Sequence, residues 1–309
     1  MADSSGLSGR IAFTAAIGAE EQILVLDLDA HRVRRLINGP GSNQWPSFSP
    51  DGTTLAFASN RDGPWEIYRA AWDGSDQRRL TYSPQNKGNP AYVPTGERII
   101  FYAESARSSD DTNIFSVGSD GRGLEQITTL TGRNTTPRVT PDGRSVTYST
   151  NRFWPGWDVC SWDLGSRQEN CLLTGTQTYC RQTHSPDGRK LAYSYGSFSR
   201  IDLWVLDTVT QERRRLTELS GKDYDATWSP DGRYLAFTSD TPTTDRYALY
   251  VVPLDGEGGL KPRLLLSGPH SIRFLSWSAV TTLELEARRI KSAEAGAAPG
   301  SSTRGGSGP

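Results

Sequence analysis

The feature that most constrains the fold of this chain is the segment of residues 228–239, which reads WSPDGRYLAFTS. It predicts a strand, a tight turn and a second strand. Pro230 presets φ for the turn, Asp231 can hydrogen-bond its own downstream backbone, and Gly232 supplies a residue with φ > 0. Residues 235–239 then alternate with the period of a half-buried strand.

This pattern recurs along the whole chain. The turn proline or its counterpart stands at Pro50, Pro94, Pro141, Pro186, Pro230 and Ala279, at spacings of 44, 47, 45, 44 and 49 residues. Each repeat adds a third strand and a fourth that ends in a basic–apolar–Thr-like triplet, as in residues 66–68 and 79–81. A period in the mid-forties with four strands is typical of a β-propeller blade, and five blades are complete.

The two ends of the chain supply the sixth blade. Residues 8–14 match the second half of the repeat, residues 22–24 and 35–36 provide two more strands, and residues 274–278 provide the missing first strand. The sequence therefore predicts an all-β fold: a six-bladed β-propeller over residues 8–280, with the last blade closed by strands from both termini. Such closure removes free sheet edges.

The remaining segments are short. Residues 1–7 are an N-terminal extension, and residues 281–309 are a C-terminal tail, which we expect to be disordered from about residue 296 because it consists of Gly, Ser, Pro and Ala. Residues 282–285 also alternate and could compete for the second-strand position of the last blade. No apolar run is long enough for a transmembrane helix, and the first ten residues lack the apolar core of a signal peptide.

The repeats resemble those of a known family. They read SPDGxxLAFxSNRDGxxEIY…RRLT, best seen in residues 49–81, and are similar to the TolB-like propellers over about residues 8–280. TolB itself carries an N-terminal α/β domain before its propeller, and nothing in this sequence matches that domain. The resemblance implies a propeller of this kind and envelope-associated contacts with proteins.

Charge and composition narrow the classes of partner. Lys and Arg total 34 and Asp and Glu total 35, so bulk charge does not favour nucleic-acid binding. We expect no membrane insertion, no cofactor and a monomer.

In a propeller the first strand of each blade lines the central channel. Alternation predicts that residues three and five positions before the turn proline face the channel and that those two before it pack between blades. The five-before ring is Trp45, Asn89, Thr136, Arg181, Asp225 and Phe274. Asp225 is a candidate partner for Arg181, whereas Arg138, in the three-before ring, has no evident partner. Either ordered water or chloride satisfies Arg138, or the carboxylate of a ligand does.

The loops between second and third strands open on the same face. An inserted aromatic pair, Phe153 and Trp154, stands in an otherwise polar loop there, while Trp65 and Trp157 occupy equivalent places and suit blade packing. His270 lies on another mouth loop. The predicted binding residues at the channel mouth are Arg138, Arg181, Asp225, Trp45, Asn89, Phe153, Trp154 and His270.

The cysteines suggest one cross-link. If the hairpin after residue 160 is centred between Gly165 and Ser166, residues whose numbers sum to 331 are paired, so Cys160 and Cys171 face each other within disulfide reach; two reduced, packed cysteines are the alternative. An oxidised pair favours an extracytoplasmic location, in the periplasm or at the cell surface, over a cytoplasmic one. The three histidines do not converge, so we expect no histidine metal site, and His184 falls in an inter-blade packing position.

Two functions remain open. The first is a non-catalytic binding scaffold whose channel mouth docks a protein or peptide. The alternative is a carbohydrate-active enzyme, or a propeller that binds a sugar or small ligand at the same mouth. The chain lacks a G-x-S-x-G elbow, and its S-P-D-G turns differ from sialidase boxes. We predict no catalytic residues, and the scaffold is the favoured hypothesis.

Overall fold

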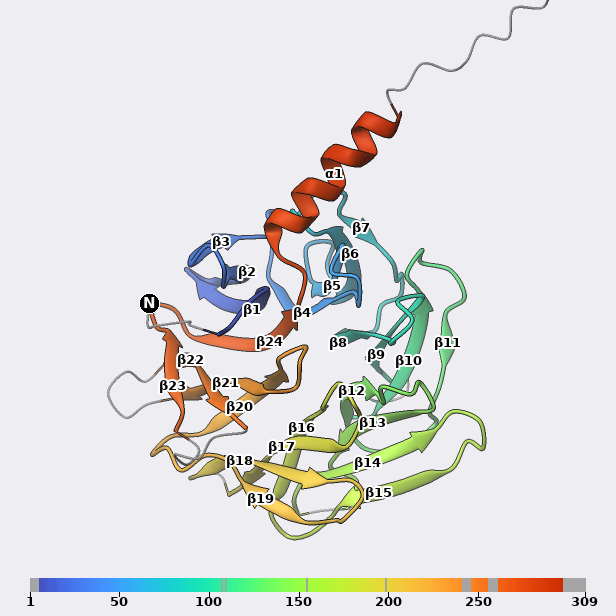
Figure 1. Cartoon of the computed structure of the whole chain (residues 1–309). Helices are drawn as coiled ribbons and strands as arrows, with labels where there is room; N and C mark the ends of the chain where they lie inside the picture. The colour runs from blue at the N-terminus through green and yellow to red at the C-terminus, as the bar shows by residue number, and fades with distance from the viewer. Residues whose placement is uncertain are drawn as a thin grey trace, which may run out of the picture.

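The computed structural model describes residues 6–106, 108, 110–153, 155–197, 199–240, 246–254 and 261–296. Six four-stranded antiparallel sheets surround a central axis, with β24, β4, β8, β12, β16 and β20 nearest to it (Figure 1). The prediction of a six-bladed propeller is confirmed.

We name the sheets blades A to F. Blade A holds β24 (Ile272–Ser278), β1 (Arg10–Ile17), β2 (Glu20–Asp27) and β3 (Arg32–Arg35). Blade B holds β4 (Asn43–Phe48), β5 (Thr54–Ser59), β6 (Glu66–Ala71) and β7 (Arg78–Arg79). Blade C holds β8 (Lys87–Tyr92), β9 (Arg98–Glu104), β10 (Thr112–Gly118) and β11 (Glu125–Gln126). Blade D holds β12 (Asn134–Val139), β13 (Ser145–Thr150), β14 (Asp158–Asp163) and β15 (Glu169–Leu173). Blade E holds β16 (Thr178–His184), β17 (Lys190–Gly196), β18 (Ile201–Asp207) and β19 (Arg213–Arg215). Blade F holds β20 (Asp223–Trp228), β21 (Tyr234–Asp240), β22 (Tyr247–Pro253) and β23 (Arg263–Leu266).

Blade A closes the ring with strands from both ends of the chain. The C-terminal strand β24 pairs with β1, so that Ile11 stands opposite Trp277 and Arg10 opposite Ser278. Trp277 Nε1 also donates to the Ser8 carbonyl at 3.0 Å. The predicted closure by both termini is therefore present.

Every innermost strand carries the same backbone irregularity. The residue five positions before the turn proline has φ between 50° and 55° in all six blades, although none of these residues is glycine. The pairing register shifts at this point in each strand, for example between Gln44 and Ser47. This is a β-bulge with one residue in the left-handed region, a feature that bends a strand and increases its twist.

The threonine that ends the fourth-strand triplet has a packing role. Thr81 Oγ1 accepts the Ile67 amide at 2.9 Å and donates to Glu66. Thr128 does the same with Ile114 and Asn113. The short outer strand is thereby fastened to the third strand by a side chain, which explains the repeated triplet.

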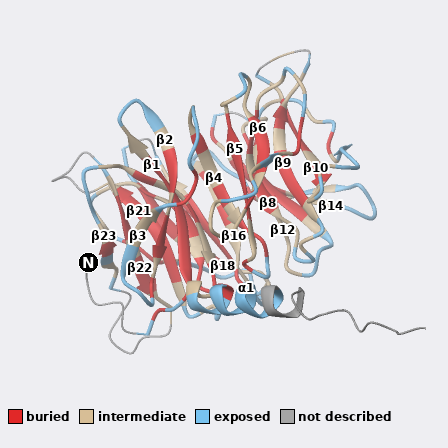
Figure 2. Cartoon of the chain, turned by 90° about the horizontal axis from the view of Figure 1, so that it is seen from above, coloured by how far each residue is buried: buried red, intermediate tan, exposed pale blue. Residues whose placement is uncertain are grey.

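The apolar core lies between the blades rather than in one centre. Buried segments run through the middle of the strands, and exposed ones gather in loops and in the helix (Figure 2). Phe48 and Trp228, both two residues before a turn proline, belong to such inter-blade clusters. His184 occupies the same position in blade E, where its Nε2 lies 3.1 Å from Thr147 Oγ1.

One helix, α1 (Thr282–Gly296), follows β24. It lies on the face that carries the β4–β5 turn (Figure 2), where Leu285 is buried and Arg288 Nη1 donates to the Asp51 carbonyl at 3.4 Å. The sequence hypothesis that residues 282–285 form a strand is not what the structure contains. The tail beyond residue 296 lies outside the described residues. No helix in the described ranges is long and apolar enough to cross a membrane.

Candidate binding site at the channel mouth

The bulged residues form the throat of the channel. Trp45, Asn89, Thr136, Arg181, Asp225 and Phe274 line it, together with Arg138 and with the residues that follow five of the six bulged positions: Pro46, Pro90, Gln182, Ala226 and Leu275. The cavity at this level measures about 30 Å³, which is room for a water molecule or a small ion.

A charged cluster stands where the throat opens. Asp225, on β20, accepts from Arg181 Nη1 of blade E and forms an ion pair with Arg273 Nε of blade A at 3.3 Å. The carboxylate is 8% exposed, and burial alone would raise its pKa, but the two guanidinium groups lower the pKa below its ordinary value. Burial likewise would lower the pKa of Arg181, yet Asp225 holds that pKa above its usual value. Asp225 and Arg181 therefore stay charged at neutral pH.

Aromatic rings hold the two guanidinium groups in place. The Arg181 guanidinium carbon lies 4.8 Å from the Tyr224 ring centroid and 5.4 Å from that of Phe274. Arg273 lies 4.4 Å from the centroid of Tyr247 and 5.5 Å from that of Phe274. Such cation–π contacts fix the direction of each planar donor group.

Above this cluster lies a wider cavity of about 460 Å³. Its walls include the charged cluster's Arg181 and Arg273, the rings of Trp45, Trp157, Tyr224, Tyr247 and Phe274, and the side chains of Cys180 and Lys222. Its size falls within the range of small-ligand and peptide side-chain pockets. Burial raises the pKa of the Cys180 thiol to about 11, so this cysteine is a poor nucleophile.

Arg138 differs from the other throat residues in its partners. Its Nη1 donates to the neighbouring Pro137 carbonyl at 2.8 Å, and no carboxylate among the described residues forms an ion pair with it. Burial lowers its pKa to about 10, a shift that Asp225 partly offsets. Together with Arg181, Arg273 and Lys222, it gives the throat and mouth more cations than the single carboxylate of Asp225 neutralises.

The structure brings together five of the predicted mouth residues. Trp45, Asn89, Arg138, Arg181 and Asp225 line the throat, and the ion pair expected between Arg181 and Asp225 is present. Strict alternation along the inner strands was wrong, because the bulge places the five-before and six-before residues of several blades together at the mouth. Of the three-before ring only Arg138 lines the throat. Ser47 and Ser276 of that ring instead accept a backbone amide of the next blade.

The other predicted mouth residues stand apart from this cavity. Phe153 is 48% exposed on its loop, with the Arg152 guanidinium carbon 4.6 Å from its ring, and it does not line either cavity. His270 does not line them either. Trp154 lies outside the described residues. Sequence reasoning missed Arg273, Tyr224 and Tyr247; the first two stand six residues before the turn position, which only the bulge brings to the mouth.

The cysteine pair lies on the outer hairpin of blade D. Cys160 on β14 stands opposite Cys171 on β15, which is the pairing expected for this hairpin, and the two sulfur atoms are joined in a disulfide. Cys180 is the free cysteine.

Comparisons with known proteins agree with this architecture. Residues 5–154 match the family described as the TolB beta propeller domain. A "Protein TolB homolog" of Chlorobium chlorochromatii is 34% identical over 198 residues, which are 61% of this chain and 42% of the homolog. A "Tol-Pal system protein TolB" of Francisella tularensis subsp. mediasiatica is 27% identical over 268 residues, 85% of this chain and 61% of the relative.

A solved structure gives the same fold. The crystal structure of TolB from Acinetobacter baumannii superposes with a TM-score of 0.75 at 23% identity, covering 87% of this chain and 66% of that one. The chain thus spans about 40–60% of the length of the curated relatives cited here.

Proposed function

Because this chain is a TolB-like six-bladed β-propeller, we propose that it is a non-catalytic binding scaffold that docks a protein or peptide partner at its channel mouth. The observation that carries the proposal is the pair of guanidinium groups, Arg181 and Arg273, oriented by aromatic rings beside one shared carboxylate. The names of the Tol-Pal relatives support a protein partner.

The chemistry of the mouth favours an acidic group on that partner. Asp225 balances only one of the two guanidinium groups, and Arg138 and Lys222 add further positive charge nearby. A carboxylate of the partner can accept two hydrogen bonds from an arginine edge, and the surrounding rings supply apolar contact area. A peptide with an acidic side chain or a free C-terminal carboxylate fits this arrangement.

The same geometry argues against acid–base catalysis. Glycoside hydrolysis requires two carboxyl groups across the substrate bond. In the described part of the throat and mouth, the cavity linings contain one carboxylate, Asp225, and two arginines keep it ionised. A group held in that state by two ion pairs neither donates a proton nor accepts one readily at neutral pH.

The test is affinity capture with the full chain from envelope and cytosolic extracts, followed by a titration of each retained protein by calorimetry. The variant Arg181→Ala/Arg273→Ala should weaken binding by at least about a hundredfold, the loss of two charge-assisted contacts. A matched control, Arg288→Ala/Arg289→Ala, removes the same charge from the helix on the opposite face and should bind as wild type. Equal binding by wild type and the mouth variant would place the docking surface elsewhere.

A sugar or small-ligand site in the same cavity remains the second candidate, because its aromatic rings suit the apolar faces of a sugar ring. Oligosaccharides that raise the melting temperature of wild type but not of Tyr247→Ala would favour this alternative over a protein partner.

We further propose a monomer in the periplasm or at the cell surface. The Cys160–Cys171 disulfide supports this location, since such bonds persist in oxidising compartments. Fractionation of the source cells with thiol trapping should find these two cysteines oxidised outside the cytoplasm; recovery of the reduced protein in the cytosol would contradict it.

A further inference from the structure

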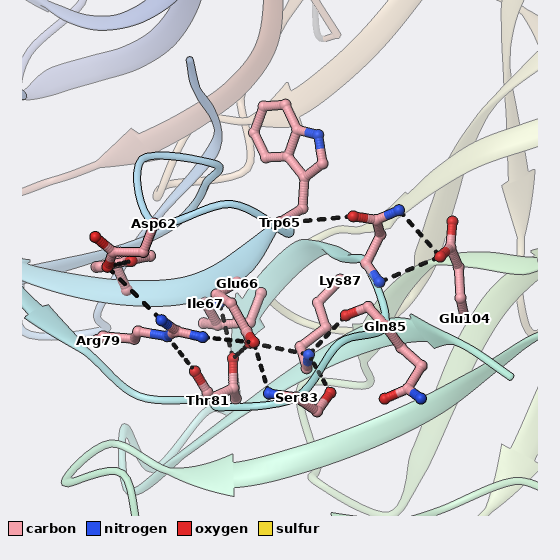
Figure 3. A network of polar contacts seen from close by, with 12 residues as sticks. Asp62, Trp65, Glu66, Ile67, Arg79, Thr81, Ser83, Gln85, Lys87 and Glu104 are labelled. Atoms are coloured by element: carbon pink, nitrogen blue, oxygen red, sulfur yellow. Dashed lines mark hydrogen bonds and ion pairs between the residues drawn. The ribbon is translucent and has the colours of Figure 1, made fainter. Parts of the chain in front are cut away.

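An ion pair between a carboxylate of blade B and an ammonium group of blade C joins these two blades near the mouth (Figure 3). Glu66, at the start of β6, is fully buried and meets Lys87, at the start of β8, with Nζ 2.9 Å from Oε2. Arg79 Nη2 and the Ser83 amide donate to Oε1 at 2.9 and 2.7 Å, and Thr81 donates to Oε2. Both oxygens of this buried carboxylate are therefore satisfied, and an ammonium group bridges the two blades.

The boundary between blades E and F has an equivalent carboxylate–arginine pair, but a carboxylate replaces the lysine. Asp202 on β18 corresponds to Glu66, and Arg215 Nη2 donates to its Oδ2 at 2.9 Å as Arg79 does in blade B. Asp223 begins β20 as Lys87 begins β8, seven residues before the turn proline in both repeats. A carboxylate thus stands at the position where the other boundary has its ammonium group.

Several oxygens at this boundary have no partner. Asp223 is fully buried, and neither of its carboxylate oxygens accepts a hydrogen bond of normal geometry. Asp202 Oδ1 is buried and unpartnered as well. The hydroxyl of Ser239, also fully buried, stands directly opposite Asp223 in the β20–β21 ladder and is unpartnered too.

Three of the four open atoms at this boundary are carboxylate oxygens, and the fourth is the hydroxyl oxygen of Ser239. Buried polar groups without partners are rare in folded proteins, and a cation accounts for a cluster of such oxygens that lacks a positively charged donor.

We propose that the boundary between blades E and F binds a calcium ion, ligated by Asp202 Oδ1, both carboxylate oxygens of Asp223 and Ser239 Oγ. The ion takes the place that the Lys87 ammonium fills between blades B and C. The donor set contains only oxygen, which selects a hard cation. Calcium completes an irregular shell of six to eight oxygens with water, whereas magnesium demands a near-ideal octahedron.

The site adjoins the mouth without belonging to it. Ile201 and Lys222, the residues that precede Asp202 and Asp223, form a parallel bridge between the two blades and line the mouth cavity. A bound ion beneath this bridge fastens the wall that carries Tyr224. Its role is therefore to hold the mouth in shape, and its binding is measurable without any partner protein.

The experiment is calorimetric titration of the chelator-treated full chain with calcium chloride, alongside thermal unfolding with calcium, magnesium or sodium. We expect one ion per chain and a melting temperature about 3–5 °C higher near saturation. Asp223→Asn should weaken calcium binding by more than about a hundredfold, beyond the effect of an outer-shell group. Asp158→Asn, which removes a buried acid of blade D whose Oδ1 accepts the Gly175 amide at 3.1 Å, should keep the full calcium response.

A second variant keeps the proposal testable if Asp223→Asn does not fold. Asp223→Lys installs the ammonium group that the boundary of blades B and C carries, and its melting temperature should no longer depend on calcium. The proposal is overturned if millimolar calcium leaves wild type unchanged, which would indicate a shared proton instead of an ion. An equal calcium response in Asp223→Asn or Asp223→Lys, or an equal response to magnesium, would also overturn it.

Discussion

At the scale of single residues, a residue that departs from the repeat pattern can be accommodated by contacts with its own neighbours, and His184 is an example. His184 stands in a position that holds Phe48, Tyr92, Val139, Trp228 and Trp277 in the other blades. Its imidazole is kept neutral there: burial lowers its pKa to about 4, an effect that Asp142 only partly offsets. The hydroxyl of Thr147 is its hydrogen-bond partner. The repeat predicted this packing role, while the partner depends on the neighbouring blade.

This residue gives a pH dependence with a definite sign. The pKa of His184 is about 4 in the folded chain against 6.5 ordinarily, so the unfolded chain binds the extra proton between these values. The contribution of the neutral His184 to the free energy of unfolding is fully present above pH 6.5. It decreases by about 2–3 kcal/mol as the pH falls toward 4, after allowance for the partial exposure of the side chain. His184→Phe should flatten this part of the pH profile in urea unfolding. A wild-type slope in His184→Phe would show that other groups control it.

At the scale of secondary-structure elements, the sequence predicted the strands and their pairing, but it did not predict the bulges of the inner strands or helix α1. The turn prolines and alternating strands placed five blades, the two chain ends placed the sixth, and the expected hairpin register paired Cys160 with Cys171. The alternation rule failed at the inner strands, because each of them contains a bulge with one residue in the left-handed region. The sequence does not signal this bulge through a shared residue type, since the bulged position holds Trp, Asn, Thr, Arg, Asp or Phe in the six blades. Arg273 was missed for this reason.

Helix α1 was missed for a different reason. Alternation over four residues suggested a strand, but residues 281–284 read T-x-x-E, the signature of a capping box. In the structure the Thr281 amide donates to Glu284 Oε2 at 2.8 Å and the Glu284 amide donates to Thr281 Oγ1 at 3.1 Å. The cap was readable in the sequence, and a start signal should have outweighed a short alternation.

The hairpin of blade D supplies the prediction at this scale. Its disulfide joins residues 11 apart, so reduction or Cys160→Ala/Cys171→Ala should lower the free energy of unfolding by about 2–3 kcal/mol through added chain entropy of the unfolded state. Denaturant unfolding with and without reductant measures it. Cys180→Ala, which leaves the disulfide intact, should respond to reductant as wild type does, and a double variant as stable as wild type would refute the entropic contribution.

At the scale of the whole molecule, the ring depends on its last strand, and helix α1 is an addition to it. Strand β24 completes blade A and supplies Arg273 and Phe274 to the mouth. The fully buried Arg10 ties this closure to blade B, since its Nε donates to the Val280 carbonyl at 2.8 Å and its Nη2 to the Gly52 carbonyl at 2.7 Å. Helix α1 contributes Leu285 and an ion pair of Arg289 with Asp73 at 3.8 Å on the face opposite the mouth.

Two truncations separate these roles. Ending the chain after residue 281 removes α1 and should lower the free energy of unfolding by about 2–3 kcal/mol, close to the burial of one leucine, because the ion pair is exposed. Calcium binding and partner binding should stay unchanged, since both sites lie near the other face. Ending it after residue 271 removes β24, leaves β1 with an unpaired edge and should abolish cooperative unfolding. Circular dichroism melts and gel filtration distinguish the two, and a folded, monomeric chain of 271 residues would mean that the ring does not need its last strand to hold the other blades together.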